Sequence, residues 1–310
     1  MSEIEGLNRK LKTPVAFFIF KRPYTTEKVF EVIRQAKPMK LLVVADGPRA
    51  DRAGEAQKCA AVKAIIDRVD WDCEVLKNYS DVNLGCKNRV SSGLDWVFKT
   101  VEEAIILEDD CLPNLSFFRF CEELLERYRN DERIMMISGT NYVGEWKSGS
   151  QSYHFSYYGG IWGWASWRRA WKNYDVKMQL WESEEVKNRI RDVLANESQY
   201  KVRAKQFEET FLGKIDTWDY QWSFARLLQS GLSVVPCKNL IANIGFGEDS
   251  THTSSTSSGV SEMLTYDFNF PIMFNEFTAV DRTYDQKLFD TIISPRRDLL
   301  AKIKNKFNKR

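Results

Sequence analysis

The sequence predicts an α/β fold in which a mostly parallel central sheet is flanked by helices. Short apolar runs recur in the first half of the chain, polar or turn-forming residues end each run, and segments with helical spacing lie between them. Strands that alternate with helices in this way build a parallel sheet. Because ligands of such sheets bind at the carboxyl ends of the strands, the polar residues that follow each strand are the first candidates for a site.

The expected elements of the first half can be placed in order. The strands are expected at 15–20, 41–45, 73–76 and 104–107, and the helices at 25–36, 54–69 and 87–100. Thr25 or Thr26 can cap the first helix, and Asp46-Gly47-Pro48 is a turn sequence that stops the second strand. Each strand thus ends where the sequence becomes polar.

The second half of the chain has a different character. It is rich in tryptophan and contains expected helices at 184–194 and 219–228, followed by a Ser/Thr-rich loop at 250–259. The sequence contains no internal repeat and no clear linker. We therefore expect both halves to share one core.

Composition excludes several classes of function. The 310 residues carry a formal net charge of +2, which gives no reason to expect a nucleic-acid partner. No stretch approaches the roughly 20 apolar residues of a membrane span, and the N-terminus lacks a signal-peptide pattern, so we expect a cytoplasmic protein. The six cysteines form no C-x-x-C pair and are expected to be reduced.

Three successive carboxylates, Glu108, Asp109 and Asp110, directly follow the apolar strand at 104–107. They repel one another, and burying them unpaired would be costly, so a positive partner is expected. Mg²⁺ or Mn²⁺ with a diphosphate fits, because such ions bind between carboxylates and phosphate oxygens. The alternative is an acidic turn that caps a helix beginning near Asn114.

Two common nucleotide-binding motifs are absent from the sequence. The first strand leads into Phe-Lys-Arg-Pro rather than G-x-G-x-x-G, and no G-x-x-x-x-G-K-[ST] occurs. A dinucleotide-binding dehydrogenase and a P-loop enzyme would both lack their anion sites here. What remains is an α/β fold that holds a diphosphate through a metal.

Four segments together resemble those of glycosyltransferases with the GT-A fold. The similarity is to bacterial family-2-like sugar transferases and, more distantly, to N-acetylglucosaminyltransferase I. The segments are IILEDDCLPNLSFFRF at 105–120, GGIWGWASWRRAW at 159–171, DTWDYQW at 216–222 and NIGFGEDSTHT at 243–253. The resemblance implies a GT-A catalytic domain over 1–260 and a C-terminal extension over 261–310.

The resemblance also implies roles for the polar residues at the strand ends. Asp110 is implied as the ligand of Mn²⁺ or Mg²⁺, Glu108 as a contact of the ribose or donor sugar, and Asp109 as the residue between them. Arg22 and Asp46 are implied as contacts of the base. For these two residues, ordinary loop polarity is the alternative.

The segment Trp162-Gly163-Trp164 matches the family's loop beside the donor sugar and the acceptor. Glycine allows a ligand to approach the backbone closely, and aromatic faces pack against sugar rings. The alternative for these tryptophans is ordinary packing in the core.

By the same resemblance, Asp219 matches the carboxylate that takes the proton of the attacking hydroxyl, and Asp216 is the nearby alternative base. A helix cap is the other interpretation of Asp219, because a carboxylate is favoured at the start of a helix. His252 lies in a Gly- and Ser/Thr-rich loop whose N–H groups can close over phosphates, and it is implied as a contact of the metal or diphosphate.

The implied activity is the metal-dependent, inverting transfer of a hexosyl or N-acetylhexosaminyl group to a saccharide hydroxyl. A UDP sugar is the expected donor, and bacterial surface glycan synthesis is the expected setting. One alternative is a nucleotidyltransferase, which would be expected to show a Gly-rich basic loop after the first strand. Another is a non-catalytic sugar-binding protein on the same fold. Residues 175–215 depart most from the family pattern, and acceptor specificity is expected there.

The C-terminal segment 295–310 combines apolar residues at helical spacing with many basic residues. Such a helix would lie on an anionic membrane surface. It would attach the enzyme peripherally to the inner face of the cytoplasmic membrane, where a lipid-linked acceptor is confined. The alternative is a basic terminus without a fixed structure.

Overall fold

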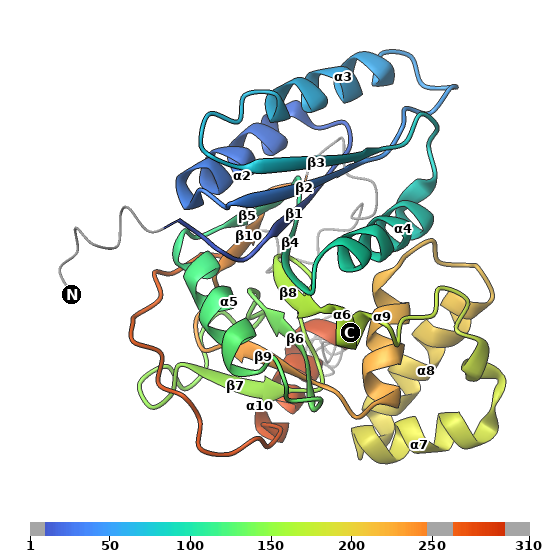
Figure 1. Ribbon diagram of the computed structural model, residues 1–310. Helices are drawn as coiled ribbons and strands as arrows, with labels where there is room; N and C mark the ends of the chain where they lie inside the picture. The colour runs from blue at the N-terminus through green and yellow to red at the C-terminus, as the bar shows by residue number, and fades with distance from the viewer. Residues whose placement is uncertain (1–9, 247–262, 295–310) are drawn as a thin grey trace, which may run out of the picture.

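The computed structural model describes residues 10–246 and 263–294 (Figure 1). Within them, eight strands form one central sheet in the order β3-β2-β1-β4-β8-β6-β9-β7. These strands are β1 (Val15–Ile19), β2 (Lys40–Ala45), β3 (Glu74–Tyr79), β4 (Glu103–Glu108), β6 (Ile134–Ser138), β7 (Tyr153–Ser156), β8 (Trp164–Trp167) and β9 (Leu232–Pro236). A small second sheet pairs β5 (Cys111–Pro113) with β10 (Ile241–Asn243).

Helices connect and cover these strands. The α-helices are α2 (Pro23–Ala36), α3 (Glu55–Ile66), α4 (Gly85–Thr100), α5 (Ser116–Arg127), α6 (Arg168–Trp171), α7 (Glu184–Leu194), α8 (Glu197–Phe211), α9 (Asp219–Leu228) and α10 (Arg282–Leu288). Two shorter helices are η1 (Gln179–Glu182) and the π-helical η2 (Phe289–Ile293).

The large sheet is mostly parallel, as predicted. β3, β2, β1 and β4 pair in parallel, and so do β6 and β9. β8 runs antiparallel between β4 and β6, and β7 runs antiparallel beside β9. The reversed β8 joins the two parallel groups into one sheet. The predicted class, an α/β fold with a mostly parallel sheet flanked by helices, is confirmed.

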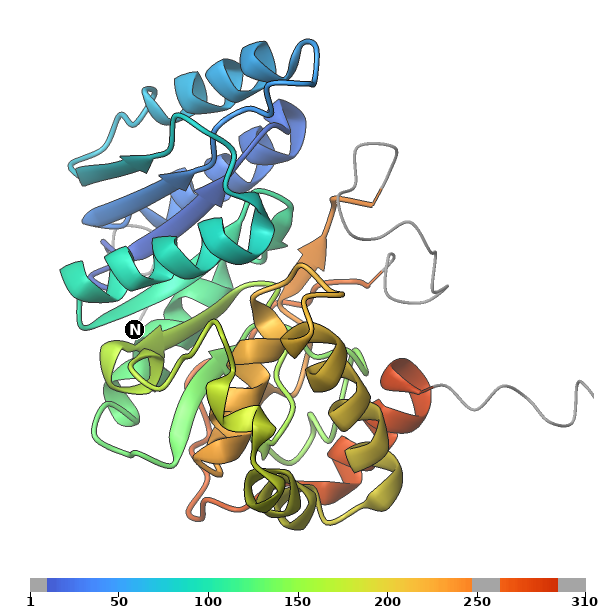
Figure 2. The same cartoon turned by 90° about the vertical axis from the view of Figure 1, so that its right-hand side faces the viewer.

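Alternate residues of β1 face opposite sides of the sheet. Val15 and Phe17 belong to a core that includes α2, α3 and α5, whereas Ala16 and Phe18 belong to a second core with α4, α6 and α9. Because both faces are covered, the strand is apolar at every position. Figure 2 shows the yellow and orange helices of the second half below the blue strands and helices of the first half.

The first helix begins earlier than predicted. α2 opens at Pro23, and Arg22 occupies its N-cap without a side-chain hydrogen bond. The hydroxyls of Thr25 and Thr26 donate to the carbonyl oxygen of Arg22 at 3.3 and 2.7 Å, so the prediction that one of them caps the helix is wrong. Proline is favoured at this position because the first N–H groups of a helix have no partner within it. By contrast, α7 and α9 have the predicted bounds.

The cysteines form no disulfide. All six lie in the described residues and are free, and Cys59, Cys111, Cys121 and Cys237 are buried. Burial raises the pKa of the Cys121 thiol well above its usual value and so keeps it protonated. The prediction of reduced cysteines is confirmed.

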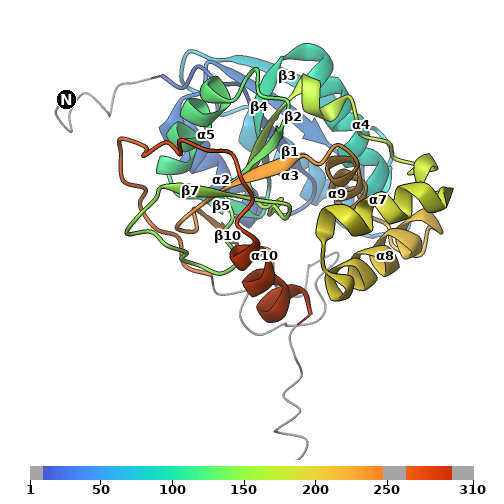
Figure 3. The same ribbon diagram turned by 90° about the horizontal axis from the view of Figure 1, so that it is seen from below.

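Residues 273–285 pack at the β7 edge of the sheet, and the described segment before them packs near β10 and α5. α10 contacts β7 (Figure 3). The ring centroid of Tyr284 lies 4.1 Å from that of His154, and the hydroxyl of Ser156 donates to the Asp285 carboxylate. No helix among the described residues is long and apolar enough to cross a membrane. The expected basic helix at 295–310 lies outside the described residues.

Candidate active site

The acidic triplet lies at the carboxyl end of β4. Glu108 is the last residue of the strand, and Asp109 and Asp110 form the turn toward β5. The backbone N–H of Phe20 donates to the Asp109 carboxylate at 2.9 Å. Nη1 of Arg22 lies 2.5 Å from a carboxylate oxygen of Asp110 and 4.0 Å from one of Asp109. Because β1 and β4 are parallel neighbours, their ends meet here and bring Arg22 to the triplet.

Two carboxyl groups of the triplet, those of Glu108 and Asp109, resist ionisation. Burial, together with the charges of Asp110, Asp109 and Asp219, raises the pKa of Glu108 to about 8. Burial and the charge of Asp110 raise the pKa of Asp109 to about 7, although Arg22 opposes this shift. A cation bound at this point would stabilise the ionised forms, so the charges of the site favour a positively charged ligand.

The segment that follows β10 closes over Asp110. The N–H of Ile244 donates to the carbonyl oxygen of Asp110 at 2.8 Å. A Cβ added to Gly245 would lie 2.2 Å from a carboxylate oxygen of Asp110, so a larger residue would displace this carboxylate. The rest of the loop, including the predicted site residue His252, lies outside the described residues.

Asp46 is buried in the turn after β2. Its carboxylate accepts hydrogen bonds from the N–H groups of Gly47, Leu84 and Gly85, at 2.9, 2.9 and 3.2 Å. Burial raises its pKa, and these N–H donors oppose the shift. These contacts fix the turn against the start of α4. The contact of Asp46 with a nucleotide base stays a prediction.

The two tryptophans of Trp162-Gly163-Trp164 have different surroundings. Trp164 lies on β8 with 1% of its surface exposed, and its ring stacks on Trp218 with centroids 5.6 Å apart. This side chain is packed in the core with Trp218 and Trp222. Trp162 is partly exposed and meets the rings of Tyr142 and Phe246 edge-on, with centroids 5.2 and 5.8 Å apart. Phe246 belongs to the segment that closes over the triplet, so this ring contact places Trp162 next to the triplet.

Gly163→Ala is expected to lower the free energy of unfolding by about 2 to 4 kcal/mol, through backbone strain and overpacking. Gly163 has a φ of +62°, and an added Cβ would lie 2.4 Å from Cδ1 of Ile241. Urea unfolding measures the loss. Gly144→Ala is the matched control, because Gly144 has a φ of +84° with no atom within 4 Å of an added Cβ. Its loss should be about 1 to 2 kcal/mol, and equal losses would contradict the close contact with Ile241.

Asp219 begins α9, as predicted, and lies near the triplet. Its carboxylate accepts a hydrogen bond from the hydroxyl of Thr217, and its charge helps to raise the pKa of Glu108. The charges of both Glu108 and Asp219 also raise the pKa of the buried Cys86 thiol. α9 and β4 thus bring two acidic groups from distant parts of the sequence into one region.

Asp216 lies at the protein surface, although its charge also helps to raise the pKa of the Cys86 thiol. It is exposed in the loop before α9, and a Cβ added to Gly85 would lie 3.4 Å from its carboxylate. Gly85 is the first residue of α4. Asp216 therefore lies beside the start of α4, whereas Asp219 lines a cavity.

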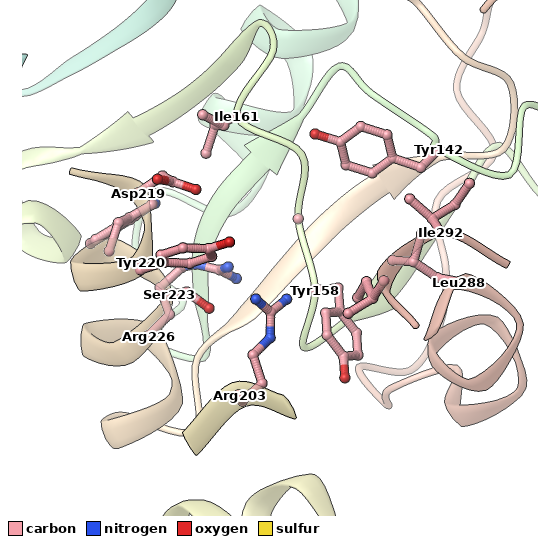
Figure 4. Close-up of a pocket in the computed structure, with 13 residues that line it drawn as sticks. Tyr142, Tyr158, Ile161, Arg203, Asp219, Tyr220, Ser223, Arg226, Leu288 and Ile292 are labelled. Atoms are coloured by element: carbon pink, nitrogen blue, oxygen red, sulfur yellow. The ribbon is translucent and has the colours of Figure 1, made fainter. Parts of the chain in front are cut away.

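This cavity has a volume of about 130 Å³ and lies between α8, α9 and the loop that precedes β8 (Figure 4). Its polar and aromatic lining residues are Asp219, Arg203, Arg226, Ser223, Tyr142, Tyr158, Tyr220 and Trp222. Figure 4 shows Asp219, Arg203 and the hydroxyl of Tyr142 directed toward the same space. The sequence assigned no role to the two arginines or the three tyrosines. The available signal was Arg226, a charged residue within the otherwise apolar end of α9.

The residues at the triplet fit a cation that is shared with a phosphate ligand. The described residues contain no group of three or more His, Cys, Asp or Glu side chains arranged to hold a metal ion. Asp110, with 18% of its side chain exposed, offers a carboxylate, and Mg²⁺ or Mn²⁺ commonly uses one or two carboxylates with phosphate oxygens. The fit is therefore to a cation that binds together with a diphosphate, not to a closed cage of protein ligands.

No family model and no curated protein sequence matches the chain. Solved structures with partial similarity include the 4-diphosphocytidyl-2C-methyl-D-erythritol synthase of Anaerococcus prevotii, at 10% identity and a TM-score of 0.34 over 56% of this chain and 77% of that one. A UDP-glucose pyrophosphorylase complexed with UDP-glucose has 11% identity and a TM-score of 0.25 over 46% of this chain and 62% of its own. The apo form of mouse xyloside xylosyltransferase 1 has 9% identity and a TM-score of 0.33 over 70% and 81%. At these identities and scores the activity has to be argued from the residues of the site.

Proposed function

We propose that the protein is a glycosyltransferase that transfers a hexosyl or N-acetylhexosaminyl group from a UDP sugar to a hydroxyl of a saccharide. The observation that carries the proposal is that two kinds of carboxylate meet in one region. The triplet after β4 is suited to a diphosphate with its cation, and Asp219 on a cavity wall is suited to take up a proton. The α/β architecture, with the triplet at the carboxyl end of a parallel strand, supports the same interpretation.

In the proposed reaction, the Asp219 carboxylate accepts the proton of the attacking acceptor hydroxyl. The acceptor oxygen forms a bond to the anomeric carbon while the bond from that carbon to the diphosphate breaks, and the electron pair leaves with the diphosphate. A single displacement of this kind inverts the anomeric centre. Asp219 suits the role better than Asp216, because only the former of the two lines the described cavity.

Asp110 would hold Mn²⁺ or Mg²⁺ together with the phosphate oxygens of the donor. When bound, the ion supplies positive charge that stabilises the leaving diphosphate. Arg22, at the end of β1, is a second positive group beside the same carboxylates. Its guanidinium is placed to attract the diphosphate to this edge of the sheet.

The proposal also includes where in the cell the reaction takes place. The C-terminal segment 295–310 would bring the enzyme to an anionic membrane surface, where a lipid-linked acceptor of bacterial surface glycan synthesis is confined. This part depends on the basic composition of the segment alone.

A thermal-shift panel of nucleotide sugars, with Mn²⁺ or with a chelator, tests the proposed function. At a hundredfold excess over Kd, a ligand adds about 2.7 kcal/mol to the folded state, which corresponds to a rise in Tm of about 5 °C. At least one UDP sugar should give this rise with Mn²⁺ and not with the chelator, and UDP should be released in the presence of a saccharide acceptor. Release of pyrophosphate, or no shift with any nucleotide sugar, would contradict the proposal.

A further inference from the structure

Two arginines lie close together at the cavity beside Asp219. Arg203 comes from α8 and Arg226 from α9 (Figure 4). Arg226 is only 3% exposed, and its Nη1 donates to the hydroxyl of Ser233 at 2.6 Å. Within the described residues, its buried Nε has no hydrogen-bond partner. A buried guanidinium with an unsatisfied donor is costly, and Arg226 holds this charge at the wall of the cavity.

The charges around Arg226 indicate that a ligand of this cavity would be negatively charged. Burial, together with the positive charge of Arg203, lowers the pKa of Arg226 to about 9, and the charge of Asp285 opposes this shift. Asp285 is itself engaged, because the hydroxyl of Ser156 and, at 3.4 Å, the N–H of Tyr157 donate to its carboxylate. The positive charges of Arg203 and Arg226 therefore repel each other at the cavity, and a carboxylate or phosphate between them would relieve this repulsion.

Aromatic rings form the rest of the polar wall. The guanidinium carbon of Arg203 lies 4.8 Å from the ring centroid of Tyr158, which fixes the arginine over that ring. Tyr142 and Tyr220 line the cavity as well, and aromatic faces suit the apolar faces of a sugar ring. Asp219 stands on the same wall, so a sugar held by the arginines would have its hydroxyl groups near the proposed base.

We infer that this cavity binds an acidic acceptor sugar, one that carries a carboxylate or a phosphate, with its anionic group on Arg203 and Arg226 and its accepting hydroxyl at Asp219. The inference rests on the proposed function and adds the chemical class of the acceptor. It gives a role to Arg203, which lies in the segment 175–215, where acceptor specificity is expected from the sequence. It also places the acceptor apart from the diphosphate at the triplet.

The test compares glycosides that differ only in the anionic group, bound to the full chain in the presence of UDP and Mn²⁺. Methyl β-glucuronide and methyl β-glucoside form one pair, and galactose 6-phosphate and galactose form the other, so that carboxylate and phosphate are examined separately. Calorimetry should show at least tenfold tighter binding of the acidic member in one pair. Arg203→Gln should remove this preference, and Arg203→Lys should restore part of it.

Arg189→Gln is the matched control, because it removes the same charge from an arginine of α7 whose side chain is 72% exposed. It should leave the preference for the acidic glycoside unchanged. Arg226→Lys keeps the buried positive charge but loses the planar set of N–H donors of the guanidinium. It should weaken binding of the acidic sugar at least tenfold.

Several outcomes would overturn the inference. They are equal binding of neutral and acidic glycosides, acidic binding that is unchanged in Arg203→Gln, and acidic binding that UDP displaces, which would place the anion at the diphosphate site. Failure of every acidic glycoside while UDP still binds with Mn²⁺ would overturn the acceptor class alone. Failure of UDP binding would instead contradict the proposed function.

Discussion

Asp219→Asn is expected to lower turnover by roughly 10² to 10⁴ while leaving the affinity for the UDP sugar nearly unchanged. The amide keeps the shape of the side chain but cannot take up the proton of the acceptor hydroxyl, and a general base contributes about this factor. Steady-state transfer kinetics and calorimetry of UDP measure the two quantities. A loss of kcat without a loss of donor affinity separates a base from a residue that only binds.

Asp216→Asn is the matched control for this experiment. Its carboxylate is exposed, lies beside the start of α4 and belongs to the same seven-residue motif. The change should alter turnover less than about threefold, since no general-base contribution is lost. If Asp216→Asn abolished turnover and Asp219→Asn did not, the base would be Asp216.

Asp110→Ala is expected to weaken binding of UDP in the presence of Mn²⁺ by about 10² to 10³. A contact between unit charges near a protein surface is worth about 4 kcal/mol at 4 Å, and each 1.4 kcal/mol is a factor of ten. A chelator added to the unchanged protein should cause a loss of similar size. Isothermal titration calorimetry with and without Mn²⁺ measures both.

Asp51→Ala is the control for this experiment, because it removes an aspartate whose side chain is 77% exposed and should leave UDP binding unchanged.

The ion pair between Arg22 and Asp110 gives Asp110→Ala a second use. Without Asp110, the guanidinium of Arg22 is released from this partner. Binding of UDP that survives or tightens in Asp110→Ala would mean that Arg22, and not a cation, holds the diphosphate.

The parallel half of the sheet could be predicted because local sequence is sufficient there. Three of its strands, β1, β2 and β4, are short apolar runs that end in polar or turn-forming residues, so Arg22 and the triplet could be assigned to one edge. β3 is of mixed polarity and is only partly buried. The start of α2 was misplaced, because the threonines were preferred as caps over the proline that opens the helix. The reversed strand β8 could not be predicted, because its pairing with β4 and β6 depends on contacts between distant segments.

The site was predicted less completely than the fold. A carboxylate looks the same in a sequence whether it faces a ligand or a turn, so the burial of Asp46 beneath the N–H groups that follow β3 was not foreseen. Trp164 and Trp162 are two residues apart, yet only the structure separates the core residue from the one beside the triplet. Arg203 and Arg226 escaped notice because a single arginine in a helix is usually a surface residue.

The proposed base and the proposed cation ligand belong to different halves of the chain, and the sheet joins these halves only through β8. A nascent chain that has completed β5 already contains the triplet but lacks the helix that carries Asp219. Formation of the active site therefore depends on contacts of large sequence separation, which are the slow ones in folding. Recovery of catalysis during refolding would report late assembly of the two halves, whereas recovery of secondary structure would report earlier, local events.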